Sequence, residues 1–173
     1  MKYFSGHEIL EHKLDQIIGR PVNSGIRGTT PYFIKELRSE ELPEFLTLED
    51  SKGIFQLFEN GLLMRVFKSS NNHSIAISFN SLQKLSLIKG KEMINPRMYS
   101  LFWLLLKLGV SIDKARYFGG WNEYRIDETK LILEADNFYC RMICSGLSFN
   151  SQARFFESLD KNVIEIKRLN SIE

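Results

Sequence analysis

The sequence predicts an α+β domain: a curved antiparallel sheet of about seven strands, or a partly open β-barrel, with a C-terminal helix and an extra N-terminal helix. Three observations support this fold class. Strand-length apolar or alternating runs recur over residues 53–144, between turn residues. Helical patterns lie at 5–18 and at 151–160. The 173 residues suit a single domain, 1–173, with a substantial core.

Residues 1–50 are expected to form an N-terminal extension that carries one helix. Residues 5–18 begin with the S-x-x-E pattern of a capping box and then repeat apolar side chains along one face. A glycine and a proline follow and end this helix. Weaker strand patterns come next, at 32–37 and 45–48.

The clearest hairpin pattern lies in the centre of the chain. Asn60-Gly61 stands between two apolar runs, and this dipeptide favours the two-residue turn that joins antiparallel strands. A turn at this position would pair Leu57 with Met64 on an apolar face. The opposite face is also largely apolar, so we expect the N-terminal helix or the apolar segment 98–108 to cover it.

The remaining strands are predicted from alternating apolar residues. Strands at 74–79 and 82–88 are expected to extend the central hairpin into a four-stranded antiparallel meander over residues 53–88. Two more pair around the turn Asp136-Asn137, and a last one is expected at a sheet edge. Their ranges are 74–79, 82–88, 129–135, 138–144 and 163–166.

Residues 98–110 are apolar almost all round and predict a helix, because leucine and methionine favour helices and Gly109 can end one. The segment is too short to span a bilayer. It is expected in the core or at the interface of a homodimer, with contact to a membrane as the less favoured alternative. The residues assigned to this interface or membrane contact are Phe102, Trp103, Leu105 and Lys107.

No catalytic or metal-binding motif stands out. Cys140 and Cys144 are four strand residues apart, about 13 Å, which is too far for a disulfide. Free thiols are typical of a reducing compartment, and the N-terminus has no apolar core of signal-peptide type, so a cytoplasmic protein is expected. The thiols lack the CxxC spacing of a redox or metal pair. Glu8 and His12 are four residues apart, a spacing that could share a metal, but a solvated polar face is the preferred interpretation. No cofactor and no metal are therefore expected, and an enzyme is the less favoured class.

The loop 115–125, ARYFGGWNEYR, is the candidate ligand-contacting segment. Its tryptophan and tyrosines are anchors with little conformational entropy, and loops on rigid sheets often carry binding residues. The competing interpretation is a glycine turn between core aromatics. Together with one arginine of the 138–144 strand, the loop supplies the candidate ligand-binding residues Arg116, Tyr117, Trp121, Tyr124 and Arg141.

The charges are nearly balanced, with 23 basic and 21 acidic residues and a net charge of +2. Binding to nucleic acid is not expected from this balance. Basic residues surround the apolar segment and can attract an anionic membrane, although solvated lysines around a core helix are the preferred interpretation. These basic residues are Lys84, Lys89, Lys91, Arg97, Lys107 and Lys114.

The order of elements resembles that of pleckstrin-homology-like domains, including the bacterial and GRAM-type relatives, over about residues 53–160. The resemblance rests on LFENGLLMRVF, SIAISFNSLQKLSLIKG, TKLILEADNFYCRMIC and NSQARFFESL. It implies a bent antiparallel sheet plugged by the C-terminal helix. The apolar insertion around 95–125 and the N-terminal extension depart from this pattern, and the turn ENG lacks the basic cluster of the members that bind phosphoinositides.

The expected function is a non-enzymatic interaction or ligand-binding module, whose partner is a protein, a small ligand or a second copy. Two alternatives remain open. One is a peripheral domain that binds anionic lipid through 98–108. The other is a small-molecule enzyme with its site in the barrel mouth, near Arg116, Tyr124 and Arg141.

Overall fold

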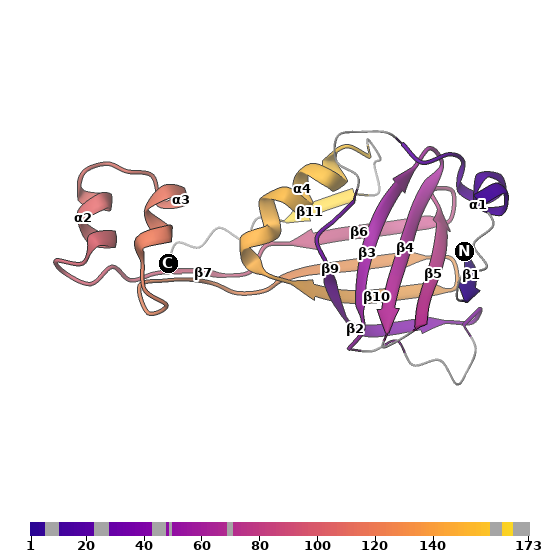
Figure 1. Ribbon diagram of the computed structural model, residues 1–173, viewed down its shortest axis with the longest axis horizontal. Coiled ribbons are helices and arrows are strands. Elements are labelled where there is room, and N and C mark those ends of the chain that lie inside the picture. The colour runs from indigo at the N-terminus through magenta and orange to yellow at the C-terminus, as the bar shows by residue number, and fades with distance from the viewer. Residues whose placement is uncertain are drawn as a thin grey trace.

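The computed structural model describes residues 1–5, 11–22, 28–42, 48, 50–68, 71–159 and 164–167. These residues form an α+β fold with one large sheet, a short two-stranded ribbon and few helices (Figure 1). They contain eleven strands, more than the seven or so that the sequence predicts. The predicted strand at 45–48 falls mostly outside the described residues.

The main sheet contains β1 (Lys2–Ser5), β2 (Tyr32–Ser39), β3 (Lys52–Phe58), β4 (Gly61–Lys68), β5 (Asn71–Ser78), β6 (Leu82–Ile88), β9 (Thr129–Ala135), β10 (Phe138–Cys144) and β11 (Ile164–Lys167). The ribbon pairs β7 (Glu92–Ile94) with β8 (Tyr124–Ile126). The helices are α1 (Glu11–Ile18), α2 (Leu101–Lys107), α3 (Ile112–Ala115) and α4 (Phe149–Glu157), with 3₁₀ turns η1 (Arg116–Phe118) and η2 (Gly146–Ser148).

The main sheet is open and mixed. Its strand order is β1-β5-β4-β3-β2-β10-β9-β6-β11, so β1 and β11 are its edges and it does not close into a barrel. The pair of β6 and β11 is parallel, which corrects the expectation of a purely antiparallel sheet. The edge position of β11 is the one predicted for the last strand.

The central hairpin forms, but its turn differs from the prediction. Phe58 pairs with Gly61, so Glu59 and Asn60 are the turn residues instead of Asn60 and Gly61. The predicted pairing is therefore wrong by two residues, a shift that leaves every side chain on its predicted face. The cause is tertiary, because the backbone N–H of Asn60 donates to the carbonyl of Ile18 in α1 at 2.8 Å.

The predicted four-stranded meander is wrong in its last strand. β3, β4 and β5 are consecutive neighbours, whereas β6 pairs with β9. The physical reason is that β6 continues into the ribbon, so its partner is the strand that returns from that ribbon. The second predicted hairpin, β9–β10 around Asp136-Asn137, is confirmed, and Asn137 has a φ of 55° in its turn.

The principal core lies between the main sheet and α4, which covers one face (Figure 1). The ring of Phe156 meets that of Phe55 at 6.1 Å between centroids. The buried Tyr32 hydroxyl donates to Oε1 of Gln152 at 2.8 Å, which links β2 to α4. The predicted helix at 151–160 is therefore present, and it packs on the sheet.

α1 covers the outer face of the central hairpin. Its Leu14 and Ile18 are buried in a second cluster with Phe58, Leu63 and Ala76. The prediction that the N-terminal helix covers this face of the hairpin is therefore confirmed. The alternative cover, segment 98–108, lies elsewhere. Residues 6–10 of the predicted helix are outside the described part of the chain.

The thiols are free and buried, as predicted. Burial raises the pKa of both, and that of Cys144 to about 12, which makes them poor nucleophiles. His73 lies in β5, and its Nδ1 is 2.9 Å from the Tyr3 hydroxyl.

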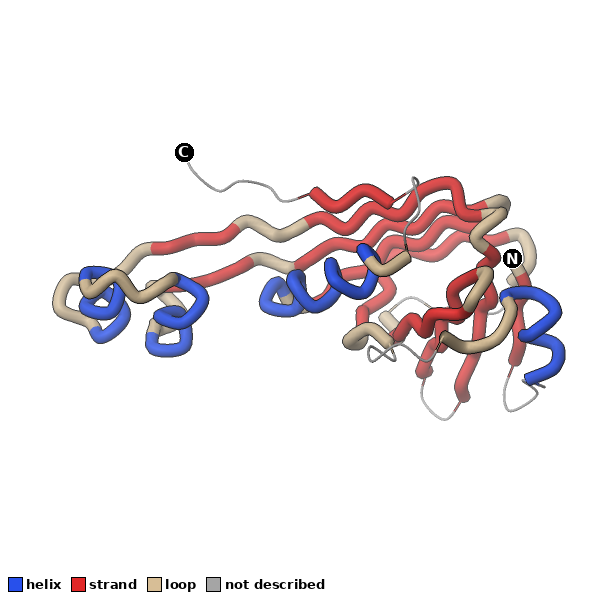
Figure 2. Tube along the Cα trace, turned by 90° about the horizontal axis from the view of Figure 1, so that it is seen from above, coloured by secondary structure: helices blue, strands red, loops and turns tan. Residues whose placement is uncertain are grey.

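Residues 89–128 leave the main sheet as an arm. β6 continues into β7, and β8 runs back into β9, so the two strands of the ribbon prolong their neighbours in the sheet (Figure 2). α2, α3 and η1 lie at the far end of the arm, away from the main sheet (Figure 1). We call residues 93–122 the arm tip.

Candidate functional site

Exposed large apolar side chains concentrate on the arm tip. The described residues contain fourteen of them, and eleven belong to the tip. These are Met93, Ile94, Met98, Tyr99, Leu101, Leu104, Leu108, Ile112, Tyr117, Phe118 and Trp121. A concentration of this kind usually marks an interaction site.

α2 is covered on one side only. Its Phe102 is fully buried, whereas Leu101, Leu104 and the following Leu108 are exposed. The expectation that this apolar segment is enclosed in a core is therefore wrong for its outer side. The physical reason is the position of α2 at the end of a ribbon, where no other described helix or strand covers its outer side (Figure 1).

The four residues assigned to an interface or membrane contact have different environments. Phe102 is buried, Trp103 and Leu105 are half-buried, and Lys107 is exposed. The Lys107 ammonium lies 5.8 Å from the centre of the Trp103 ring. The Trp103 ring also contacts that of Tyr99, at 5.7 Å between centroids.

The tip folds around a small core that it forms together with β8 of the ribbon. Its buried side chains are Phe102, Ala115 and Tyr124, with Leu105, Leu106, Val110 and Ile126 packed against them. The rings of Phe102 and Tyr124 meet edge to face at 6.3 Å between centroids. This cluster is distinct from the core of the main sheet, so the tip is an ordered unit at the end of its ribbon.

The buried carboxylate of Glu123 fastens the chain around this core. Its Oε1 accepts hydrogen bonds from the Ser100 hydroxyl and from the Arg97 backbone N–H, the latter at 2.9 Å. Its Oε2 accepts one from the Gly120 backbone N–H at 3.1 Å. These hydrogen bonds, led by that from Ser100, lower the pKa of Glu123. Ser100 also caps α2 by accepting from the Trp103 N–H at 3.1 Å.

A Glu123→Gln variant should loosen the tip and leave the main sheet folded. An amide has one acceptor oxygen, so its NH₂ group would face a donor at one of the two carboxylate positions. We expect faster hydrogen exchange in α2 and unchanged exchange in β3 and β4. The exposed Glu128 provides the control, because Glu128→Gln breaks none of these bonds. Unchanged exchange in α2 would contradict the role of Glu123.

The same carboxylate predicts a pH dependence of the tip. Its pKa is lower in the folded tip than the ordinary 4.5, so its stabilisation is complete above that value. The stabilisation is lost as the pH falls through the lowered pKa. Both tryptophans of the chain, Trp103 and Trp121, lie in the tip, so tryptophan fluorescence reports this transition.

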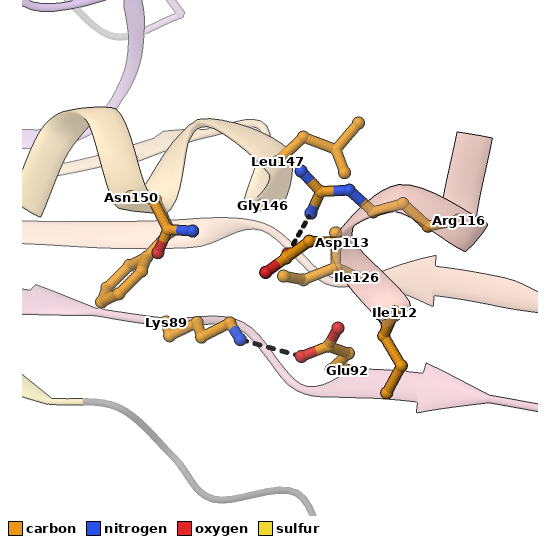
Figure 3. Close-up of a pocket in the computed structure, with 10 residues that line it drawn as sticks. Lys89, Glu92, Ile112, Asp113, Arg116, Ile126, Gly146, Leu147 and Asn150 are labelled. Atoms are coloured by element: carbon orange, nitrogen blue, oxygen red, sulfur yellow. Dashed lines mark hydrogen bonds and ion pairs between the residues drawn. The ribbon is translucent and has the colours of Figure 1, made fainter. Parts of the chain in front are cut away.

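A pocket of about 400 Å³ lies where the arm joins the main sheet (Figure 3). Lys89, Glu92 and Arg116 line it from the arm, and Leu147 and Asn150 line it from the start of α4. The Lys89 ammonium lies 2.8 Å from the Glu92 carboxylate (Figure 3).

The charged groups of this pocket are arranged in pairs. Arg116 lies 3.5 Å from the carboxylate of Asp113, and the Tyr124 hydroxyl donates to Glu92 at 2.6 Å. Burial alone would raise the pKa of Glu92, but hydrogen bonds from Lys89 and Tyr124 lower it overall. Two cations therefore face two carboxylates, which braces the base of the arm and leaves no excess charge for an ionic ligand.

The candidate ligand-binding residues do not form one site. Arg116 lines the pocket, and Tyr124 reaches the same network through Glu92. Tyr117 and Trp121 are exposed on the arm tip. Arg141 lies in β10, where it is 3.4 Å from Glu36 of β2. The open sheet also provides no barrel mouth that would join Arg141 to the others.

The described residues contain no group of three or more His, Cys, Asp or Glu side chains that could hold a metal ion. In the same part of the chain, no helix is long and apolar enough to cross a membrane. Comparison with family models, curated protein sequences and solved structures finds no match to the chain.

Proposed function

We propose that the protein is a non-enzymatic interaction module that binds its partner through the arm tip. The observation that carries this proposal is the placement of eleven exposed large apolar side chains on the tip, against three elsewhere in the described residues. Each Å² of apolar surface removed from water contributes about 25 cal/mol, so covering the tip would favour association.

The rigid structure of the arm supports this function. The tip shares a small core with β8, Glu123 fastens its loops, and paired charges brace its base. A surface held in this way loses little conformational entropy on binding. Its most exposed rings, Tyr99, Tyr117 and Trp121, offer large contact areas with few rotatable bonds.

The main sheet is the scaffold of the proposed module. The pleckstrin-homology-like interpretation of its strand order stays part of the proposal, with the binding surface on the inserted arm and not at the turn of the central hairpin. The paired charges of the pocket favour a bracing role over acid–base chemistry, so the enzyme alternative is not carried further.

Photocrosslinking in the cells that produce the protein tests this proposal. One variant carries benzoylphenylalanine in place of Trp121, a second carries it in place of Tyr99, and the matched control carries it in place of Phe67 on β4. All three side chains are exposed. We expect adducts from the two tip positions and none from Phe67.

The mass of the adduct identifies the kind of partner. A doubled mass indicates a second copy, another protein mass a different protein, and a lipid-sized increment a membrane. All three support a tip that binds. Absence of adducts at both tip positions, or equal labelling from Phe67, would overturn the proposal.

A further inference from the structure

We infer that the partner of the arm tip is the interface of an anionic phospholipid membrane, into which the tip inserts its exposed apolar side chains. This inference rests on the proposed function, because it names the surface to which the tip binds. Three properties of the tip carry it: its charge, its aromatic side chains and its dimensions.

The tip is the basic part of a nearly neutral chain. Residues 93–122 contain four basic residues and one acidic residue, a net charge of +3. The Glu123 carboxylate, whose hydrogen bonds hold the tip, lowers this to +2, which equals the net charge of the whole chain. The acidic residue, Asp113, is paired with Arg116 at 3.5 Å. Arg97, Lys107 and Lys114 are exposed. This charge complements an anionic surface.

The placement of lysine among apolar groups favours lipid over a protein partner. Lys107 lies on α2 next to the exposed Leu104 and Leu108. Charged residues, lysine above all, are depleted at the centre of protein interfaces, where they would lose their hydration. At a membrane, a lysine keeps its charge among the headgroups while its methylene stem lies along apolar surface.

The exposed aromatic side chains suit the same location. Tyr99, Tyr117 and Trp121 are each more than three-quarters exposed, at 84%, 78% and 77%. Tyrosine and tryptophan have an apolar ring and a polar group, and they are enriched at the level of the lipid headgroups. Tyr99 lies in the turn before α2, Tyr117 in η1 and Trp121 in the turn before β8, so they would anchor the tip at several points.

The dimensions permit insertion without spanning. The seven residues of α2 correspond to a length of about 10 Å, far less than the roughly 30 Å of a hydrocarbon core. The arm holds this helix away from the main sheet (Figures 1 and 2). Outside residues 93–123 the chain has 19 basic and 19 acidic residues, so its net positive charge lies on the tip.

Vesicle flotation with the full chain tests the inference. The probes are vesicles of phosphatidylcholine alone and of phosphatidylcholine mixed with phosphatidylglycerol. We expect binding to the mixed vesicles with a blue shift of tryptophan emission, because Trp103 and Trp121 both belong to the tip. Added salt should weaken this binding.

Three variants distinguish the contributions of charged and apolar side chains to vesicle binding. Neutralising the tip, as Arg97→Gln, Lys107→Gln and Lys114→Gln together, should weaken binding to the mixed vesicles by about 100-fold. Leu104→Ser with Leu108→Ser should abolish the blue shift. The control variant, Phe67→Ser, removes an exposed apolar side chain from the main sheet and should bind as the wild type does.

The outcomes separate this inference from the proposed function. Failure of the wild type to bind the mixed vesicles, or equal binding by the tip variants, overturns the inference. If the tip then crosslinks to a protein in cells, the proposed function stands with a protein partner. If it crosslinks to nothing, both fall.

Discussion

A Gly61→Val variant should lose about 3 kcal/mol of unfolding free energy and about 10 °C in its thermal midpoint. Gly61 is buried where the central hairpin meets α1. A Cβ atom at this position would lie 2.4 Å from the carbonyl oxygen of Ile77 and 2.5 Å from Cγ2 of Ile18. The first neighbour is backbone of the adjacent strand β5 and the second belongs to α1, so relief requires β4 to move away from both. Thermal denaturation followed by circular dichroism measures the loss.

Two further variants show whether space is the cause. Gly61→Ala adds the same Cβ atom and should also be strongly destabilising. Gly120→Ala is the control, because its Cβ would have Oε2 of Glu123 as its nearest neighbour, at an ordinary 3.7 Å. A tolerated Gly61→Ala would mean that the hairpin does not pack closely on α1.

The sequence implies sensitivity at Gly61 for another reason. The Asn60-Gly61 dipeptide predicts a turn that needs a positive φ at both residues, but neither residue has one. The turn forms one residue earlier, because backbone hydrogen bonds from Glu59 to Arg20 and from Asn60 to Ile18 fix it against α1. A local motif predicts that a turn exists, whereas its register depends on a helix some forty residues away.

The same distinction explains which parts of the sheet were predictable. Strands β4, β6, β9 and β10 lie close to their predicted ranges, because alternation of apolar residues is a local property. Which strands lie side by side in the sheet depends on the path that the chain takes between them. No local sequence pattern indicates that β6 pairs in parallel with β11. The same holds for the pairing of β6 with β9, because the whole arm separates these strands in the sequence.

The candidate site shows a further limit of sequence reasoning. The apolarity of 98–110 indicates a segment that avoids water, and the structure exposes half of it because the arm offers only a small core. Glu123 was missed because its partners Arg97 and Ser100 are 26 and 23 residues away and form no recognisable motif. The charge and aromatic content of the loop 115–125 make Tyr117 and Trp121 candidates; both are exposed on the tip, and their role in binding stays a prediction.

A Phe102→Ala variant should unfold the arm tip while the main sheet stays folded. Removing a buried phenylalanine costs about 3–5 kcal/mol, and the tip core has only two other buried side chains, Ala115 and Tyr124. The main sheet has a separate core with α4 and should keep its thermal midpoint. Hydrogen exchange should become fast in α2 and β8 and remain slow in β3 and β4. One cooperative transition at a much lower temperature would show that arm and sheet fold as one unit.

This variant also separates the shape of the tip from its composition. Phe102→Ala leaves the exposed Leu104, Tyr117 and Trp121 in the chain and removes the core that arranges them. A bilayer or a protein that requires the folded tip should lose binding, and the blue shift of tryptophan emission should disappear with it. Phe67→Ala is the matched control, because Phe67 is 42% exposed on the main sheet and its loss leaves the tip core intact. Full binding by Phe102→Ala would mean that apolar content alone is sufficient, and that the ordered tip is not what the partner recognises.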